Sequence, residues 1–188
     1  PVVQVLWVNS HGYFLLGQLI LAAYAADLAW QRLRRREIPA SLARTLAGVG
    51  PAVLLACFLN PYGWGVFRLF LQQFAKFGAH GVYRANIGEF RTIGDFVAAF
   101  GINNPYLLAF FVVLALGLAS FVAAGLRRRF SLFHALLFAG ATYMGWQATR
   151  NSALMTVIAA TVFLANLDEL GPPPPKPAKQ RPRRMEPL

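Results

Sequence analysis

Long apolar runs, separated by short polar and basic segments, fill most of the chain. A helix needs about 20 mostly apolar residues to cross a bilayer core of about 30 Å, and only helices and closed barrels satisfy their backbone hydrogen bonds there. The runs lack the strict alternation of barrel strands, so the pattern predicts membrane-spanning helices. We expect five spans, at about residues 5–30, 45–64, 106–126, 130–149 and 151–167.

The last two spans are predicted to be separate helices. A single helix over residues 130–167 would be about 57 Å long at 1.5 Å per residue, nearly twice the thickness of the core. It would also place Arg150 near the bilayer centre, at a cost of at least about 2.5 kcal/mol. Because Asn and Ser are good helix N-caps, we predict a tight turn at residues 150–152.

Lys and Arg residues gather on one side of these spans, in residues 32–44, 127–129 and 176–184. The opposite loops hold the more scattered Arg68, Lys76, Arg84, Arg91 and Arg150. By the positive-inside rule the clustered side is cytoplasmic, and five alternating spans reproduce this partition. Residues 1–4, about 65–104 and the turn at Arg150 are therefore predicted to be extracytoplasmic.

Composition agrees with a membrane protein. The 188 residues are 57% hydrophobic and 13% charged, whereas soluble domains carry roughly a quarter charged residues. The net charge of +11 does not indicate a nucleic-acid partner, because the basic residues flank apolar runs instead of lining a groove. The predicted partner is the lipid bilayer. The single cysteine, Cys57, cannot form an internal disulfide and is expected to be a small core residue.

We therefore predict an all-α, multi-pass protein of the cell (inner) membrane, with a transmembrane helical domain over residues 1–170. Residues 171–188 contain four successive prolines and scattered basic residues, which predicts a disordered cytoplasmic tail. The chain begins at Pro1 and lacks a signal peptide. We expect that the true N-terminus lies upstream and that the domain is part of a larger one.

One extracytoplasmic segment has the pattern of an amphipathic helix. Its apolar side chains recur at helical spacing and are Phe67, Phe70, Leu71, Phe74 and Phe77. The other face carries Arg68, Gln72, Gln73 and Lys76. The pattern predicts a helix that lies in the headgroup region with its phenyl rings toward the membrane. A helix packed on the bundle is the alternative interpretation.

The unusual polar residues fall on the extracytoplasmic side of this topology. Asn9 and His11 are expected about 10 Å inside the outer end of the first span, and Asn60 and Tyr62 at the outer end of the second. Polar groups inside a membrane are costly and usually face a cavity or one another. The candidate substrate-binding residues are Asn9, His11, Asn60, Tyr62, Glu89, Arg91, Arg150 and Asn151.

Each candidate also has a structural interpretation. His11 has the alternative of a hydrogen-bonded structural histidine, and residues 60–63 have the composition of a turn that ends a helix. Arg150 has the alternative of a snorkelling side chain, and Glu89 that of a solvated loop charge. No phosphate-binding loop, His-Glu-x-x-His, Cys-x-x-Cys or Gly-x-Ser-x-Gly motif is present. The sequence gives no direct support for a nucleotide hydrolase, metalloprotease or serine hydrolase.

Four short motifs together resemble a known family. They are residues 6–12 (LWVNSHG) followed by Phe14 and Gly17, residues 59–63 (LNPYG), residues 87–90 (IGEF) through Asp95 and Phe96, and Arg150 with Asn151. They resemble bacterial C-type (GT-C) glycosyltransferases, which take sugars from polyprenyl-phosphate carriers at the extracytoplasmic face. The resemblance covers most of residues 5–165 and implies a polyprenyl-phosphate sugar as donor.

The resemblance also implies what this chain lacks. In that family the first extracytoplasmic loop carries acidic residues that act as base or metal ligand, so a divalent metal is possible in the complete protein. No acidic residue precedes Asp27 here, and Asp27 is predicted at the cytoplasmic end of the first span. By analogy, Arg150 would neutralise the carrier phosphate, and His11 or Glu89 would contact the donor or acceptor. A transporter and a non-catalytic assembly subunit are the alternatives.

Overall fold

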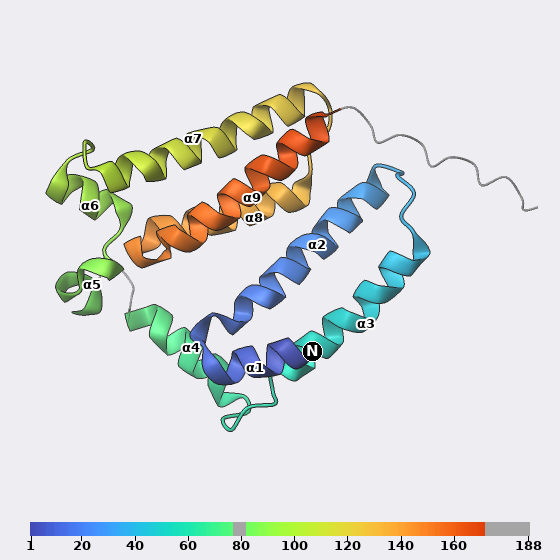
Figure 1. Cartoon of the computed structure of the whole chain (residues 1–188). Coiled ribbons are helices and arrows are strands. Elements are labelled where there is room, and N and C mark those ends of the chain that lie inside the picture. Colours follow the sequence, from blue (N-terminus) through green and yellow to red (C-terminus); the bar gives the residue numbers. More distant parts are fainter. Residues whose placement is uncertain (77–81, 172–188) are drawn as a thin grey trace, which may run out of the picture.

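The computed structural model describes residues 1–76 and 82–171, and across these residues all regular structure is helical (Figure 1). The elements are α1 (Val2–Ser10), η1 (Gly12–Phe14), α2 (Leu15–Leu33), α3 (Ala40–Ala56), α4 (Gly65–Lys76), α5 (Val82–Asn86), η2 (Gly88–Phe90), α6 (Ile93–Phe100), α7 (Pro105–Leu126), α8 (Leu132–Gln147), η3 (Thr149–Asn151) and α9 (Ser152–Leu170). The all-α prediction is thus confirmed for the described part of the chain. Residues 172–188 of the predicted tail (residues 171–188) and Phe77 lie outside the described part.

Three helical segments are long and apolar enough to cross a membrane. They are Gly12–Leu33, Pro105–Leu126 and Thr149–Leu170, each of 22 residues. At 1.5 Å per residue each is about 33 Å long, which matches a hydrocarbon core of about 30 Å. The fold therefore indicates a membrane protein. The helices α3 and α8 are shorter, with 17 and 16 residues.

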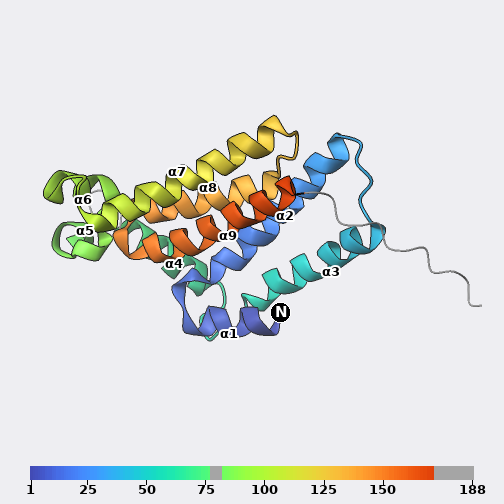
Figure 2. The ribbon, with the colours of Figure 1, turned by 45° about the horizontal axis from the view of Figure 1, so that its top comes forward.

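The helices α7, α8 and α9 form the main packing unit (Figure 2). Its core joins Phe110 of α7, Phe138 of α8 and Met155 of α9, all almost fully buried. Small residues let these backbones approach, as is common between membrane helices. A Cβ added at Gly145 of α8 would lie 2.8 Å from the Cβ of Met155. Substituting Gly145 would therefore require α8 and α9 to separate.

The N-terminal helices form a second packing unit around Val8, Phe14, Cys57 and Val66. Cys57 is fully buried, as the sequence predicted for a small core residue. Its sulfur accepts a hydrogen bond at 3.2 Å from the amide of Gln4. The unit joins the main one through α2, which packs on α8.

The first predicted span is interrupted. The chain is not helical at His11, which has an extended backbone (φ −152°, ψ 140°) and separates α1 from the helical stretch that begins at Gly12. The Nδ1 atom of His11 accepts a hydrogen bond from the backbone N–H of Tyr13 at 3.1 Å. This bond stabilises the break because it satisfies one N–H at a helix start. The prediction that Asn9 and His11 lie inside one continuous helix is therefore wrong.

The other predicted spans agree with the structure to different extents. The prediction of two helices in residues 130–167 is confirmed. The helix α8 ends at Gln147, η3 follows at Thr149–Asn151, and α9 begins at Ser152.

The second predicted span is shorter than expected, since α3 ends at Ala56. In α4 the rings of Phe67 and Phe70 lie 5.7 and 6.1 Å from that of Phe14, so these two side chains pack on the protein. The side chain of Phe74 lies outside what the structure describes.

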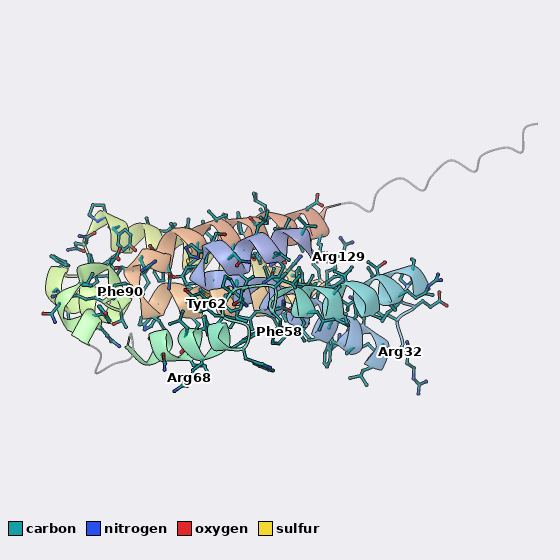
Figure 3. All side chains as sticks on the ribbon, turned by 90° about the horizontal axis from the view of Figure 1, so that it is seen from below. Arg32, Phe58, Tyr62, Arg68, Phe90 and Arg129 are labelled. Atoms are coloured by element: carbon teal, nitrogen blue, oxygen red, sulfur yellow. The ribbon has the colours of Figure 1, made fainter. Side chains whose placement is uncertain are left out.

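Connecting segments gather at two opposite ends of the helices (Figures 1 and 2). We call residues 9–14, 59–63, 88–95 and 149–152 the turn end. We call residues 30–36, 127–131 and 169–171 the arginine end. Viewed from below, Phe90 lies at one extremity, and Arg32 and Arg129 lie toward the other (Figure 3).

Candidate functional site

Two short 3-10 helices, η2 and η3, lie side by side at the turn end. The N–H of Thr149 donates to the carbonyl of Arg91 at 3.0 Å, and the Thr149 hydroxyl donates to the carbonyl of Glu89 at 3.1 Å. These bonds join two segments that are about 60 residues apart in the sequence. Arg91 thus contributes its carbonyl to the site. The pairing fixes the positions of Glu89 and Arg150.

Arg150 contacts two groups of η2. One of its Nη atoms lies 3.7 Å from a carboxylate oxygen of Glu89, and its guanidinium carbon lies 5.0 Å from the centre of the Phe90 ring. The side chains of Arg150 and Glu89 are 38% and 57% exposed. An ion pair this exposed is worth at most about 1 kcal/mol. The guanidinium is therefore held in place but remains accessible from outside the helices.

Asn151 connects this cluster to the N-terminal helices. Its side-chain oxygen accepts a hydrogen bond of 2.5 Å from the phenol of Tyr13, 138 residues away in sequence. Its amide donates to the carbonyl of Met144 at 3.1 Å, near the end of α8. The ring of Tyr13 in turn lies 5.0 Å from that of His11. His11 and Asn151 are thus joined through Tyr13.

Asn9 and Asn60 both stabilise the chain reversal after α3. The Asn9 amide donates to the carbonyl of Leu59 at 2.8 Å, and the Asn60 side-chain oxygen accepts from the N–H of Tyr62 at 2.8 Å. The next residue, Gly63, has φ +48°, a conformation that glycine adopts at no steric cost. Asn60 therefore has the turn-forming role that its motif allowed. The Tyr62 side chain is 71% exposed.

A capped helix, α6, completes the turn end. The hydroxyl of Thr92 accepts from the N–H of Asp95 at 3.1 Å, while the Asp95 carboxylate accepts from the N–H of Thr92 at 3.0 Å. This reciprocal arrangement is a capping box. Arg84 of α5 also pairs with Asp95 at 3.0 Å. The hydrogen bonds from Thr92, and then the Arg84 charge, lower the pKa of Asp95 below its ordinary value.

Several residues of this end escaped the sequence analysis. Tyr13 and Thr149 make its principal contacts. The phenol oxygen of Tyr106 lies 2.8 Å from the carbonyl oxygen of Thr149 and is also within hydrogen-bonding distance of the Ser152 hydroxyl. In the sequence, the only feature that could have indicated these residues is that the tyrosines lie beside predicted turns. Their hydrogen-bond partners belong to other elements, so these contacts become visible only once the helices are packed together.

The candidates form one series of contacts. It runs from the Asn60 turn through Asn9 to the break at His11, then through Tyr13 to Asn151, and from the adjacent Arg150 to Glu89. Chemically, this surface offers the guanidinium groups of Arg91 and Arg150, together with an imidazole, carboxylates, amides and phenols. It can bind an anion and orient a polar group.

The metal implied by the family resemblance does not fit the described residues. Within residues 1–76 and 82–171, no group of three or more His, Cys, Asp or Glu side chains is placed to hold an ion. The earliest acidic residue, Asp27, lies toward the arginine end. Its carboxylate accepts from the N–H of Leu132 at 3.1 Å and from the amide of Gln31 at 2.7 Å.

Comparison of the chain with protein-family models, with curated proteins and with solved structures finds no match. The family resemblance therefore rests on the four sequence motifs alone, and the site is defined by its geometry.

Proposed function

We propose that the chain is a multi-pass protein of the cell (inner) membrane with about five spans, namely the three long apolar segments together with α3 and α8. At 17 and 16 residues, α3 and α8 are about 25 Å long. Helices of this length cross where the bilayer thins or flanking residues reach the interface. The distribution of arginines then makes the turn end extracytoplasmic and the arginine end cytoplasmic.

In this arrangement α4 lies along the extracytoplasmic headgroup region. Two observations support this placement. Leu69 and Leu71 are 46% and 67% exposed although apolar, and Trp64 just before the helix is 75% exposed. Exposed tryptophan and leucine side chains are favourable at a membrane interface. Phe67 and Phe70 meanwhile attach the helix to the bundle.

Within that membrane protein, the turn end is proposed as part of a GT-C-like glycosyltransferase site that takes a sugar from a polyprenyl-phosphate carrier. The hydrogen bond between Tyr13 and Asn151 carries this proposal, because it joins the first and last motifs of the family resemblance. Arg150, adjacent to Asn151, supplies a positive charge that compensates a lipid phosphate. His11 and Glu89 are assigned to contacts with the donor or acceptor.

Arg150 and His11 provide the test. Membranes containing the full-length protein, as wild type, Arg150→Ala or His11→Ala, are incubated with radiolabelled polyprenyl phosphate, and retained label is counted. We expect Arg150→Ala to weaken retention about tenfold or more, since it removes a charge that pairs with phosphate. The matched control is Arg68→Ala, which removes an exposed arginine from α4.

Sugar transfer is measured on the same membranes once a donor is found. Both site variants are expected to insert normally and to reduce transfer. Wild-type retention and transfer by Arg150→Ala and His11→Ala would remove this site from consideration. Equal losses for Arg68→Ala and Arg150→Ala would show a general effect of surface charge instead.

A membrane transporter is the alternative function. A transporter needs polar groups inside the helical bundle, and the structure contains a buried group of this kind. Asn166, fully buried in α9, donates to the hydroxyl of Ser120 at 2.9 Å and lies 2.9 Å from the ring Nδ1 of His134. These side chains bond to one another and link α7, α8 and α9, which is also how an assembly subunit would be stabilised. Solute flux in reconstituted vesicles distinguishes a transporter from both other functions.

A further inference from the structure

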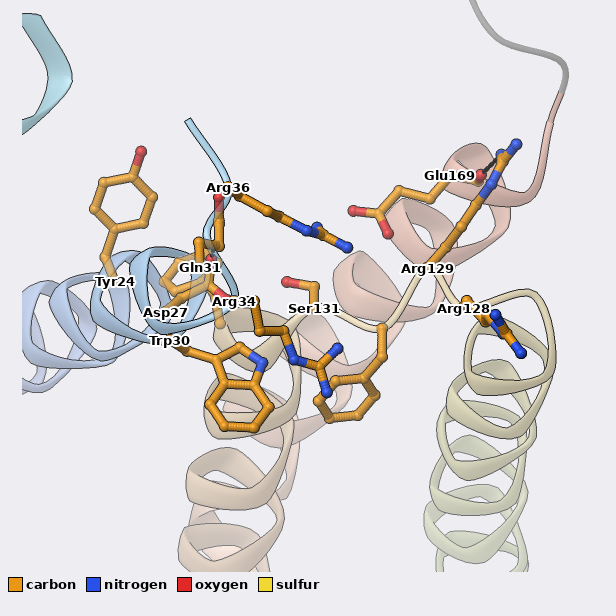
Figure 4. A pocket seen from close by; sticks show the side chains of 12 residues that line it. Tyr24, Asp27, Trp30, Gln31, Arg34, Arg36, Arg128, Arg129, Ser131 and Glu169 are labelled. Carbon is orange, nitrogen blue, oxygen red and sulfur yellow. Dashed lines mark hydrogen bonds between the residues drawn. The ribbon is translucent and has the colours of Figure 1, made fainter. Parts of the chain in front are cut away.

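A cavity of about 480 Å³ lies at the arginine end, opposite the turn end (Figure 4). It lies where α2 ends, α8 begins and α9 ends. Polar and aromatic side chains line it together, including Asp27, Glu169, Ser131, Trp30 and Tyr24. Four arginines also line it, namely Arg34, Arg36, Arg128 and Arg129.

Positive charge exceeds negative charge in this cavity. Four arginines and two acidic residues, Asp27 and Glu169, are among the lining residues, which gives a formal lining charge of 4 − 2 = +2. Asp27 already accepts two hydrogen bonds within the protein. Arg129 donates to the backbone carbonyls of Glu169 and Gly171. An anion that enters the cavity would therefore find guanidinium groups whose charge the lining carboxylates do not fully balance.

Arg34 and Arg36 are the arginines best placed to bind such an anion. Arg34 lies over the Trp30 ring, with its guanidinium carbon 4.5 Å from the ring centre. Figure 4 shows the side chain of Arg36 extending from the end of α2 toward Glu169 across the cavity. The stacking on Trp30 orients the Arg34 guanidinium, which reduces the entropy lost when it binds a phosphate.

The position of the cavity points to a lipid as the source of the anion. Trp30 and Asp27 belong to Gly12–Leu33 and Glu169 belongs to Thr149–Leu170, two of the segments long enough to cross a membrane. The cavity therefore lies at the level where such segments leave the hydrocarbon. Tyr24 and Phe133, in T-shaped contact at 5.4 Å, give it an apolar wall beside the charged rim. The arginines of the rim suit the charged headgroup of a lipid, and the aromatic wall suits the start of its acyl chain.

We propose that this cavity binds the phosphate of an anionic phospholipid, with Arg34 and Arg36 as the principal ligands and the Tyr24–Phe133 wall beside the acyl chain. The inference is independent of the glycosyltransferase proposal, since it concerns the opposite end of the protein. It requires only that the long apolar segments lie in a bilayer.

Fluorescence of Trp30 provides the test. The full chain carries Trp7→Phe, Trp64→Phe and Trp146→Phe, which leaves Trp30 as the only tryptophan. It is reconstituted with dibrominated phosphatidylglycerol or dibrominated phosphatidylcholine, whose bromines quench an adjacent tryptophan. The concentration dependence of quenching gives the preference for the anionic lipid. Native mass spectrometry of the unsubstituted protein counts retained lipid and does not depend on the tryptophan substitutions.

The matched variants remove the same charge from the same arginine run. Arg34→Gln with Arg36→Gln takes two lining arginines, whereas Arg32→Gln with Arg35→Gln takes two that do not line the cavity. We expect the lining pair to reduce the preference for phosphatidylglycerol about tenfold and the control pair to change it less than twofold. Equal effects of the two pairs, or no preference in the parent protein, would overturn the proposal. Displacement of the lipid by millimolar inorganic phosphate would do so too, because the site would then take free phosphate.

Discussion

The two ends of the helical bundle use polar residues in opposite ways. At the turn end, side chains pair with one another and with backbone groups, as in Tyr13 with Asn151 and Thr92 with Asp95. At the arginine end, guanidinium groups outnumber carboxylates around a cavity. The short motifs of the family resemblance lie at the turn end. The clustered arginines, from which the sequence predicted only the orientation of the chain in the membrane, lie at the arginine end.

The comparison shows that a polar residue's partners decide what it can bind. Asn9 and Asn60 make hydrogen bonds to backbone groups of the chain reversal after α3, so these side chains help to position the turn end. Arg150 contacts Glu89 and Phe90 but keeps more than a third of its side chain exposed. Arg34 is oriented by an aromatic ring, a contact that leaves its hydrogen-bond donors available.

The largest expected effect comes from breaking the packing on which the turn end rests. Gly145→Ala places a Cβ 2.8 Å from the Cβ and 3.0 Å from the Cγ of Met155, so α8 and α9 must move apart just below η3. We expect a loss of about 1–3 kcal/mol in the free energy of unfolding. The measurement is thermal unfolding of the detergent-solubilised protein, followed by size-exclusion chromatography of a fluorescent fusion.

The control for this substitution lies on the same helix. A Cβ at Gly140 would meet nothing within 4 Å, so Gly140→Ala is expected to be neutral or slightly stabilising, because alanine favours the helix by up to about 1 kcal/mol. Equal destabilisation by both substitutions would show that α8 does not depend on close contact at Gly145.

Asp27→Ala probes the arginine end. The buried carboxylate holds the N–H of Leu132 at the start of α8, so its removal should cost about 1–2 kcal/mol of stability. Asp27→Asn keeps an acceptor oxygen and should cost less. Thermal unfolding of the two variants checks this order. Unchanged stability of Asp27→Ala would contradict the proposed contribution of this carboxylate to holding the start of α8.

The sequence predicted well those features that depend on local pattern. Hydropathy located the helix of residues 105–126, and the cost of burying Arg150 located the turn between α8 and α9. The break at His11 was missed because hydropathy does not register a backbone bend that contains no proline. The basic cavity was missed for another reason. Its arginines come from segments about 90 residues apart, and only the packing of α2 on α8 brings them together.

The contact between Tyr13 and Asn151 supplies an intermediate effect. A double-mutant cycle of Tyr13→Phe and Asn151→Ala should give a coupling free energy of about 1 kcal/mol, because each substitution alone already breaks the hydrogen bond. Thermal or denaturant unfolding of the four proteins measures it. Strict additivity would show that the N-terminal helices and η3 are not joined by this bond, and the continuous series of candidate residues would then be divided in two.

The smallest effect is a pH dependence at the turn end. The pKa of Asp95 is lowered in the folded protein, so its charged form stabilises the fold. This contribution is fully present above the ordinary carboxyl pKa of about 4. It is lost as the pH falls from there through the lowered pKa. Asp95→Asn should therefore lower the free energy of unfolding at neutral pH. We expect the loss to be less than about 1 kcal/mol, because the carboxylate is 44% exposed. The difference from wild type should shrink at pH 3.

The control is Asp168→Asn, which removes an exposed carboxylate near the arginine end without touching the capping box. It should have a smaller effect at neutral pH. A difference between Asp95→Asn and wild type that grows on acidification has the wrong sign for a carboxylate stabilised by Thr92 and Arg84.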